Sequence, residues 1–270
     1  MTSAPGTRKG TAVDAAIEVR GLTKRFGGVN ALTDVDITAR RGAITALIGP
    51  NGSGKSTTIN VVTGIYRADA GEVTAFGRDI SSTRTAEIAR MGIVRTFQTP
   101  RLFPGMTVLE NALAGAHMQV RANLLWQAIG GYRRGRTERE LRARALELLE
   151  IAGLADQADE NAAALSTGSQ KLLDLVRALM ARPQVLLLDE PAAGLNDTET
   201  DELGTFLGAM REVGLTVVFV EHNMSLVLAV SDEINVLHEG RVVFSGTPQA
   251  FRGDQAVSEA FLGKVADEQH

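Results

Sequence analysis

The sequence contains no cysteine and few aromatic residues. None of its 270 residues is cysteine, which excludes disulfides, thiol nucleophiles and cysteine-ligated zinc. Phe, Trp and Tyr together make up 4% of the chain, so we expect no base-stacking platform of the kind that binds single-stranded nucleic acid. The four histidines are far apart in the sequence and therefore indicate no metal site.

The chain also lacks an excess of positive charge and any long apolar run. Its 28 Lys and Arg against 32 Asp and Glu give a net charge of −4, which argues against general nucleic-acid affinity. No apolar run approaches the roughly 20 residues of a membrane helix, and the N-terminus lacks the apolar core of a signal peptide. These absences predict a chain that neither spans a membrane nor is secreted. With 44% apolar residues, it has the composition of a folded domain.

The residues that are present predict an α/β fold. Residues 1–16 are small and polar and predict a disordered lead-in, whereas from Ile17 apolar and polar residues alternate as in half-buried strands. Continuous apolar runs, which are typical of central parallel strands, occupy residues 44–48, 185–188 and 215–220. Helical spacing occupies residues 107–118 and 137–153. Helix-rich sequence between strand-rich ends predicts a doubly wound parallel sheet with a helical insertion.

The strongest signal for function is a phosphate loop directly after the first apolar run. Its pattern is G-x-x-x-x-G-K-[ST], in which the glycines turn backbone N–H groups toward phosphate oxygens at a helix N-terminus. The lysine can reach the β- and γ-phosphates, and the serine hydroxyl can bind Mg²⁺. The segment predicts an ATP–Mg²⁺ site, and its residues are Gly49, Pro50, Asn51, Gly52, Ser53, Gly54, Lys55, Ser56 and Thr57.

Two adjacent carboxylates follow the apolar run that ends at Leu188. Catalytic groups of open α/β sheets lie at the carboxyl ends of strands. We therefore expect Asp189 to hold Mg²⁺, directly or through water, and Glu190 to polarise the attacking water. A strand followed by a solvated acidic turn is the alternative, but the phosphate loop favours the catalytic interpretation.

Two further polar residues gain meaning beside a phosphate loop. The side-chain amide of Gln98 can ligate Mg²⁺ or orient water, and a neutral His222 can hydrogen-bond the γ-phosphate or the attacking water. Both are hypotheses, because an ordinary surface glutamine and a structural histidine fit the same pattern.

Between the phosphate loop and the two carboxylates lies Leu165–Gln170, with the pattern L-S-x-G-x-Q. Together with the phosphate loop and the acidic strand, it resembles the signature segment of the ATP-binding subunits of ABC transporters. The resemblance implies that Ser166, Gly168 and Gln170 contact ATP bound to the opposite subunit, so that two subunits enclose two nucleotides. It also implies that Phe26 stacks on adenine, unless Phe26 is a core residue, and that Gln98 and His222 are the glutamine loop and the switch histidine.

The resemblance extends over residues 17–263 and implies the domain organisation. It implies a P-loop NTPase (RecA-like) parallel sheet core with an N-terminal antiparallel β subdomain and an inserted α-helical subdomain. We therefore expect a disordered lead-in followed by three segments. The lead-in is 1–16, the β subdomain with the first part of the core is 17–98, the helical subdomain with the signature is 99–174, and the second part of the core with a helical tail is 175–270.

A finer resemblance is to the branched-chain amino-acid uptake (LivG-like) subfamily. It depends on the long stretch before the signature and on segments 94–98, 101–103, 106–108, 110–111, 190–196 and 220–222. The chain departs from that subfamily at three positions, which leave Ser166, Gly168 and Glu190 in place but put substrate identity in doubt. Thr167 stands where Tyr is usual, Leu172 where a basic residue is usual, and Asp197 where Pro is common.

The resemblance also implies partners and a location. These are a second ABC ATPase subunit, either a copy or a homologue, two transmembrane permease subunits and, indirectly, an extracytoplasmic substrate-binding protein, at the cytoplasmic face of the cell membrane. The basic stretch 132–139 is either a contact with lipid or permease or a solvated helical face. Urea or amide uptake, lipopolysaccharide-type export and a non-transport ABC ATPase remain alternatives.

Overall fold

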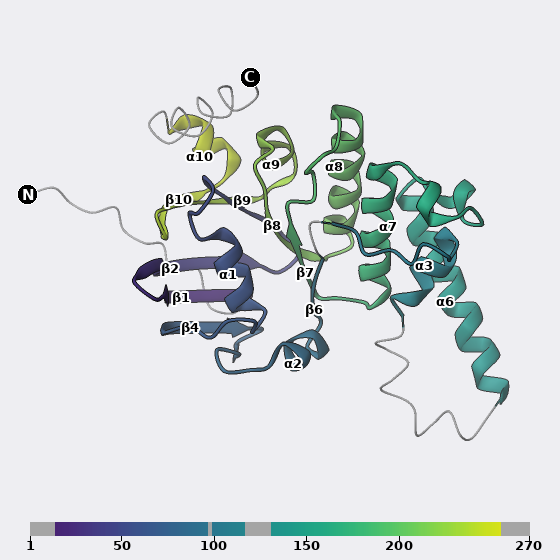
Figure 1. Ribbon diagram of the computed structural model, residues 1–270, viewed down its shortest axis with the longest axis horizontal. Coiled ribbons are helices and arrows are strands. Elements are labelled where there is room, and N and C mark those ends of the chain that lie inside the picture. Colours follow the sequence, from purple (N-terminus) through teal and green to yellow (C-terminus); the bar gives the residue numbers. More distant parts are fainter. Residues whose placement is uncertain (1–13, 97–98, 117–130, 255–270) are drawn as a thin grey trace, which may run out of the picture.

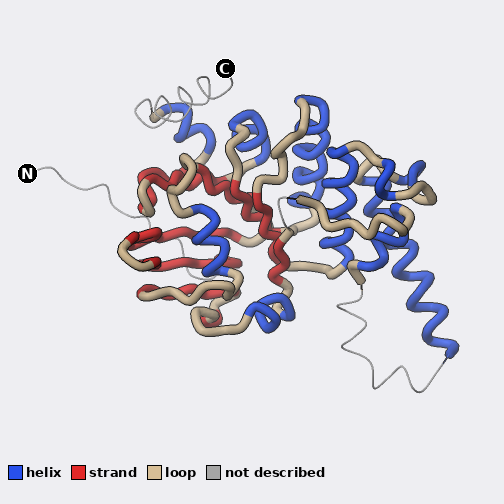
Figure 2. Tube along the Cα trace, viewed as in Figure 1, coloured by secondary structure: helices blue, strands red, loops and turns tan. Residues whose placement is uncertain are grey.

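The computed structural model describes residues 14–96, 99–116 and 131–254, which form two sheets with helices around them (Figure 1). The first sheet has four antiparallel strands in the order β2-β1-β4-β5, and the second has six strands in the order β10-β9-β3-β8-β7-β6. Figure 2 shows the antiparallel sheet beside one face of the larger sheet, with most helices on the other side. The predicted α/β fold is confirmed.

The antiparallel sheet is built from alternating apolar residues, as predicted. Val19 and Ile37 face each other in the β1–β2 pair and are buried, and the chain reverses at Gly27 and Gly28. The predicted end of the lead-in is wrong by two residues, because Ala16 is fully buried and its carbonyl accepts a hydrogen bond from the Phe76 amide at 2.9 Å. The strands are β1 Ala15–Phe26, β2 Val29–Arg40, β4 Ala70–Ala75 and β5 Arg78–Asp79.

The six-stranded sheet is parallel except at one edge. Each predicted apolar run forms a central strand, and β3 lies between β8 and β9 with parallel pairing to both. At the edge, β10 returns antiparallel to β9. The strands are β3 Ile44–Ile48, β6 Ile93–Arg95, β7 Val185–Asp189, β8 Thr216–Val220, β9 Glu233–His238 and β10 Arg241–Gly246.

The helices follow the predicted spacing where the structure describes it. The predicted helix at 107–118 is shorter, because α3 is capped by Thr107 and ends at Ala114; residues 117–118 lie outside the described residues. The helices are α1 Lys55–Val62, α2 Thr85–Arg90, α3 Val108–Ala114, α6 Gly131–Ile151, α7 Thr167–Met180, α8 Asp197–Glu212, α9 Met224–Val230 and α10 Pro248–Gly253, with short 3₁₀ turns η2 Ala155–Gln157 and η3 Ala162–Ala164.

Each central strand contributes to two hydrophobic cores, one on either face of the six-stranded sheet. Leu186 and Leu188 of β7 pack with the helices of one face, while Val185 and Leu187 pack against the antiparallel sheet and α1 on the other. Because neighbouring side chains of a strand point to opposite faces, a continuous apolar run is needed to fill both cores. The loops at the strand ends are therefore held by packing from both sides.

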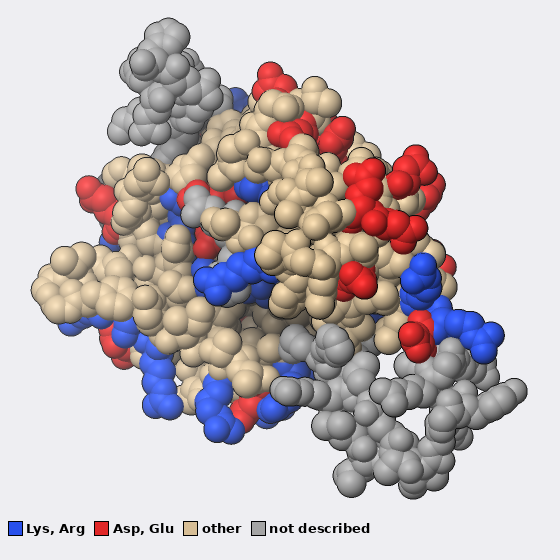
Figure 3. Space-filling model, turned by 45° about the vertical axis from the view of Figure 1, so that its right-hand side comes forward, with Lys and Arg blue, Asp and Glu red and all other residues tan. Residues whose placement is uncertain are grey.

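Helices α3 and α6 pack on α7 at one end of the molecule (Figure 1). The expected domain boundary at 174 falls inside α7, which continues without a break to Met180. Figure 3 shows acidic side chains gathered over the upper right of its view and basic ones mainly along the lower part. Within the described ranges, no helix has the length and apolar character needed to cross a membrane.

Candidate functional site

The phosphate loop connects β3 to α1 through two glycines that no other residue can replace without strain. Gly49 has φ 149°, and a Cβ there would lie 2.1 Å from the Leu237 carbonyl oxygen. Gly54 has φ 106°, and a Cβ there would lie 2.7 Å from the Ala31 carbonyl oxygen. The loop is thus pressed against the β9 end and against β2, with its open side toward solvent at Asn51 and Gly52.

The loop ends at a helix N-terminus that fits an anion. Gly54 occupies the cap position of α1 and makes no side-chain capping hydrogen bond. The first-turn N–H groups and the helix dipole therefore favour a negatively charged ligand. Ser56 is exposed and Thr57 is half-buried beside this end, whereas Ser53 of the loop is buried, with 2% exposed. These residues fit the phosphate groups of ATP.

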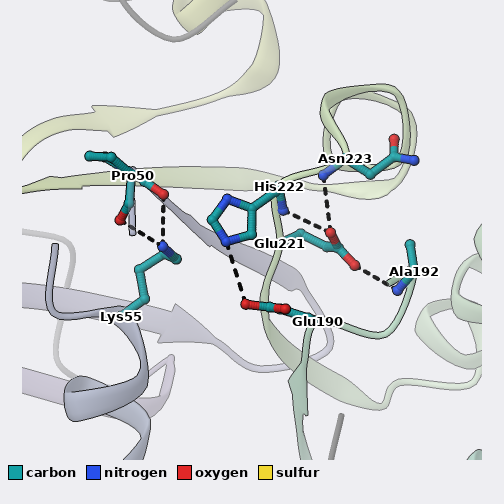
Figure 4. Close-up of polar contacts among 8 residues, drawn as sticks. Pro50, Lys55, Glu190, Ala192, Glu221, His222 and Asn223 are labelled. Carbon is teal, nitrogen blue, oxygen red and sulfur yellow. Dashed lines mark hydrogen bonds and ion pairs between the residues drawn. The ribbon is translucent and has the colours of Figure 1, made fainter. Parts of the chain in front are cut away.

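Lys55 is buried at the start of α1 and points back into the loop (Figure 4). Its Nζ donates hydrogen bonds to the carbonyls of Gly49 at 2.7 Å and Pro50 at 3.0 Å. Burial lowers the pKa of Lys55, and the carboxylates of Glu190 and Asp189 oppose that shift. The lysine is therefore held inside the concave loop, in the field of the predicted catalytic carboxylates.

The predicted carboxylates stand at the carboxyl end of β7, next to the phosphate loop across the sheet. Asp189 is the last residue of the strand, and its Oδ2 accepts a hydrogen bond from Arg95 at 2.7 Å. Glu190 follows with φ 47°, a left-handed conformation that is rare for a residue with a side chain and is concentrated at functional sites. Its amide donates to the Val220 carbonyl at 2.9 Å, which ties the turn to β8.

His222 faces Glu190, as Figure 4 shows. The distance between His222 Nε2 and Glu190 Oε1 is 3.4 Å. This meeting follows from the strand order β3-β8-β7, which places the loops after these three strands side by side at one sheet edge. Phosphate loop, carboxylates and histidine thus form one site. Gln98, predicted as a metal ligand and water-orienting residue, lies outside the described residues.

Phe26 lies at the end of β1, where the chain turns into β2. The residue is 42% exposed, which contradicts the alternative of a core phenylalanine. Tyr66 packs edge-on against it with ring centroids 5.1 Å apart, and Lys24 Nζ lies 5.3 Å from its centroid. The aromatic pair offers an exposed stacking surface for a base.

The signature residues lie at the start of α7, where they already hold a carboxylate. Ser166 caps the helix, and its hydroxyl and the Gly168 amide both donate to Glu199 Oε1 at 3.1 Å. Glu199 belongs to α8 and also completes the capping box of that helix with Asn196. These donors therefore accommodate an anionic oxygen, as a phosphate-binding role requires. The side-chain amide of Gln170 donates to the carbonyl of Leu165, just before α7, at 3.1 Å.

The Glu199 contact predicts a pH dependence of stability. Hydrogen bonds from the Asn196 and Gly168 amides are the main causes that lower the pKa of Glu199. The contact therefore stabilises the fold above the ordinary glutamate pKa of about 4.3 and is lost as pH falls through the lowered folded-state pKa. In urea unfolding from pH 6 to 3, we expect wild type to lose more stability than Glu199→Gln. Equal losses would contradict this, and Glu202→Gln on the same helix controls for removal of a charge.

Two of the three departures have a structural explanation. Leu172 is 5% exposed and packs in the larger hydrophobic core, a place where an apolar side chain fits. Asp197 lies in the first turn of α8, where a negative charge interacts favourably with the helix dipole. Nothing in the structure explains Thr167, which is exposed.

The sequence prediction missed three charged residues that surround the site. Arg95 joins Asp189 to Asn60 of α1, with 2.6 Å between its guanidinium and the Asn60 amide oxygen. Lys171 and Glu221 contact the loop after Glu190. The segments that carried the resemblance contain Arg95 and Glu221, but only their three-dimensional neighbours reveal what they do.

Comparisons with known proteins agree with this geometry. The sequence profile of the ABC transporter family matches residues 32–193. The chain is 40% identical over 250 residues to the high-affinity branched-chain amino acid transport ATP-binding protein BraF of Pseudomonas aeruginosa, with 92% of this chain and 98% of that protein covered. The chain belongs to the ABC transporter ATP-binding family. LivG of Escherichia coli K12, described in the same words, is 39% identical with the same coverage.

Solved structures place this ABC ATPase in the same fold. An ATP-binding cassette of an ABC transporter in its ADP conformation is 32% identical, with TM-score 0.77 and coverage of 92% of this chain and 99% of that one. A nucleotide-free ATP-binding cassette has TM-score 0.73 at 32% identity, with 91% and 98% covered. The P-loop NTPase fold, ATP binding and ATPase activity that the resemblance implied are thus those of this chain.

Proposed function

We propose that this ABC ATPase energises a membrane importer for branched-chain or other hydrophobic amino acids. The observation that supports it best is similarity over nearly the full length to BraF and LivG, which are branched-chain amino acid transport ATP-binding proteins. The site agrees, because a phosphate loop, Glu190 and His222 meet at one sheet edge.

In the proposed reaction, Glu190 accepts the proton of the attacking water and His222 hydrogen-bonds the γ-phosphate. The 3.4 Å contact between them keeps both side chains on one side of the site. The Ser56 hydroxyl and Asp189, with Gln98, would hold Mg²⁺. No cluster of three or more acidic or histidine ligands exists among the described residues. This fits Mg²⁺, which is commonly held by one or two side chains together with substrate phosphates.

The proposed assembly is a dimer of two such ATPase subunits, copies or homologues, with ATP between them. The donors at the start of α7 support it, since Ser166 and Gly168 already hold the Glu199 carboxylate. In the dimer they would bind the γ-phosphate of ATP held by the phosphate loop of the neighbouring subunit.

The proposed docking surface for the permease is the segment 99–107, which leads into α3. This segment exposes Phe103 by 48% and Met106 by 40%, and Arg177 of α7 lies over the Phe103 ring at 5.8 Å. Exposed apolar side chains on the segment that leads into α3 suit contact with another protein. Two permease subunits, with a substrate-binding protein beyond them, would place the chain peripherally at the cytoplasmic face of the membrane.

Co-expression with candidate permease subunits tests the proposal. We expect the ATPase to copurify with them from detergent-solubilised membranes, and vesicles loaded with ATP to accumulate leucine. Copurification with uptake of urea or an amide would correct the substrate, and outward movement of lipid would correct the direction. ATPase activity without any membrane partner would favour a non-transport ABC ATPase.

A further inference from the structure

Two buried charged residues hold the short loop that follows Glu190. From α7, the Lys171 Nζ donates to the carbonyls of Pro191 at 2.9 Å and Ala193 at 2.6 Å. From the end of β8, the Glu221 Oε1 accepts the amide of Ala192 at 2.6 Å (Figure 4). The peptide group between Pro191 and Ala192 is therefore held at both ends, with its carbonyl on a cation and its N–H on an anion.

The same two side chains reach the other parts of the site. The second carboxylate oxygen of Glu221 accepts the amides of His222 at 2.7 Å and Asn223 at 3.0 Å. Lys171 belongs to the helix that Ser166 caps. The loop clamp, defined as Lys171 and Glu221, thus joins the signature helix, the loop after Glu190 and the backbone of His222.

Burying the two charged side chains of the loop clamp costs hydration free energy. Lys171 is 8% exposed and Glu221 is 3% exposed. Buried charges lose hydration, and here they are compensated by hydrogen bonds to the backbone. The charges of Glu221, Glu190 and Glu199 partly oppose the lowering of the Lys171 pKa by burial. Stability alone does not account for charged residues at these positions, whereas precise placement of Glu190 and His222 does.

We propose that Lys171 and Glu221 are positioning residues that make the signature helix, Glu190 and His222 move as one unit. The inference rests on the proposed function, in which the signature binds the ATP of the opposite site. When the signature of one subunit closes on the ATP of the opposite site, the same movement would bring Glu190 and His222 of that subunit into position at its own site. The two sites would then hydrolyse ATP cooperatively. The polar atoms of both side chains already bond the protein backbone, so we expect ATP binding itself not to need them.

Variants of the full chain that remove one charge test the loop clamp. Lys171→Met keeps the length of the side chain but loses its donors. In Glu221→Gln a single oxygen replaces two, so at least one of the three amides loses its acceptor. For both we expect kcat to fall about tenfold or more, KM for ATP to stay within about twofold, and the Hill coefficient for ATP to fall toward one. Lys171→Arg restores a charged donor and is expected to recover part of kcat.

The readouts separate positioning from mere structure. Glu202→Gln, an exposed change on α8, is the control and is expected to match wild type. Unchanged kcat and Hill coefficient in both variants, equal losses in kcat and ATP affinity, or failure of both variants to fold would each overturn the proposal. Wild type is measured first, because absence of cooperative ATP turnover there would instead overturn the proposed dimer.

Discussion

Glu190→Gln is expected to bind ATP but to hydrolyse it about 10²–10⁴-fold more slowly than wild type. The glutamine side chain has nearly the shape of the glutamate side chain. The turn, which is held by the hydrogen bond from the backbone amide of residue 190 to the Val220 carbonyl, should therefore keep its structure. What it loses is the ability to accept the proton of the attacking water. Phosphate release gives the rate, and a fluorescent ATP analogue gives the affinity.

A matched change on α8 provides the control for Glu190→Gln. Glu202 is exposed, and Glu202→Gln removes the same charge outside the site, so its turnover should equal that of wild type. Turnover near wild type in Glu190→Gln would contradict the assignment of Glu190 as the base. Loss of ATP binding together with turnover would instead indicate a folding role for the strained residue.

Lys55→Ala is expected to weaken ATP binding by about ten- to a hundredfold. The estimate follows from about 1.5–3 kcal/mol for a hydrogen bond to a charged group and about 1.4 kcal/mol for each tenfold change. Lys55 already lies inside the loop, bonded to the Gly49 and Pro50 carbonyls, and from there its ammonium can exchange to the phosphates. Titration with the fluorescent analogue measures the effect.

Thermal unfolding must accompany the Lys55→Ala titration, because the residue is buried. Arg84→Ala, just before α2, removes an exposed cation and is expected to leave ATP binding unchanged. Unchanged ATP affinity in Lys55→Ala would contradict the phosphate contact. Weakened affinity with a folded chain supports it.

The central strands and the phosphate loop were predictable because their signals are local. The run at 185–188 must be apolar throughout to fill both cores, and the glycines of the phosphate loop are required by backbone conformation. Strand β4 was not foreseen, because only Val73 and Ala75 are buried in it, too few to set up an alternating pattern. The expected end of the lead-in was misplaced because the residues at its boundary are alanines, and an alanine in a sequence gives little indication of whether it is buried.

The charged residues around the site were not predictable, because their roles depend on distant partners. Arg95 lies 94 positions before Asp189, and Lys171 lies 20 before Pro191. A lysine or glutamate is most often exposed, so a single sequence gives no reason to bury either. Glu199 shows the same limit: its spacing from Asn196 suits a capping box, but nothing in that spacing indicates the signature amide.

The position of Phe26 at the tip of the antiparallel sheet has a mechanical consequence. The proposed base-stacking surface belongs to one sheet and the phosphate loop to the other, and the two are joined through the core shared by Leu32 and Leu47. A nucleotide that contacts both sheets would link them to each other across this shared core. A ligand that binds only the folded chain raises its stability. ATP should therefore stabilise the contact between the two sheets more than inorganic triphosphate does, because triphosphate cannot reach the first sheet.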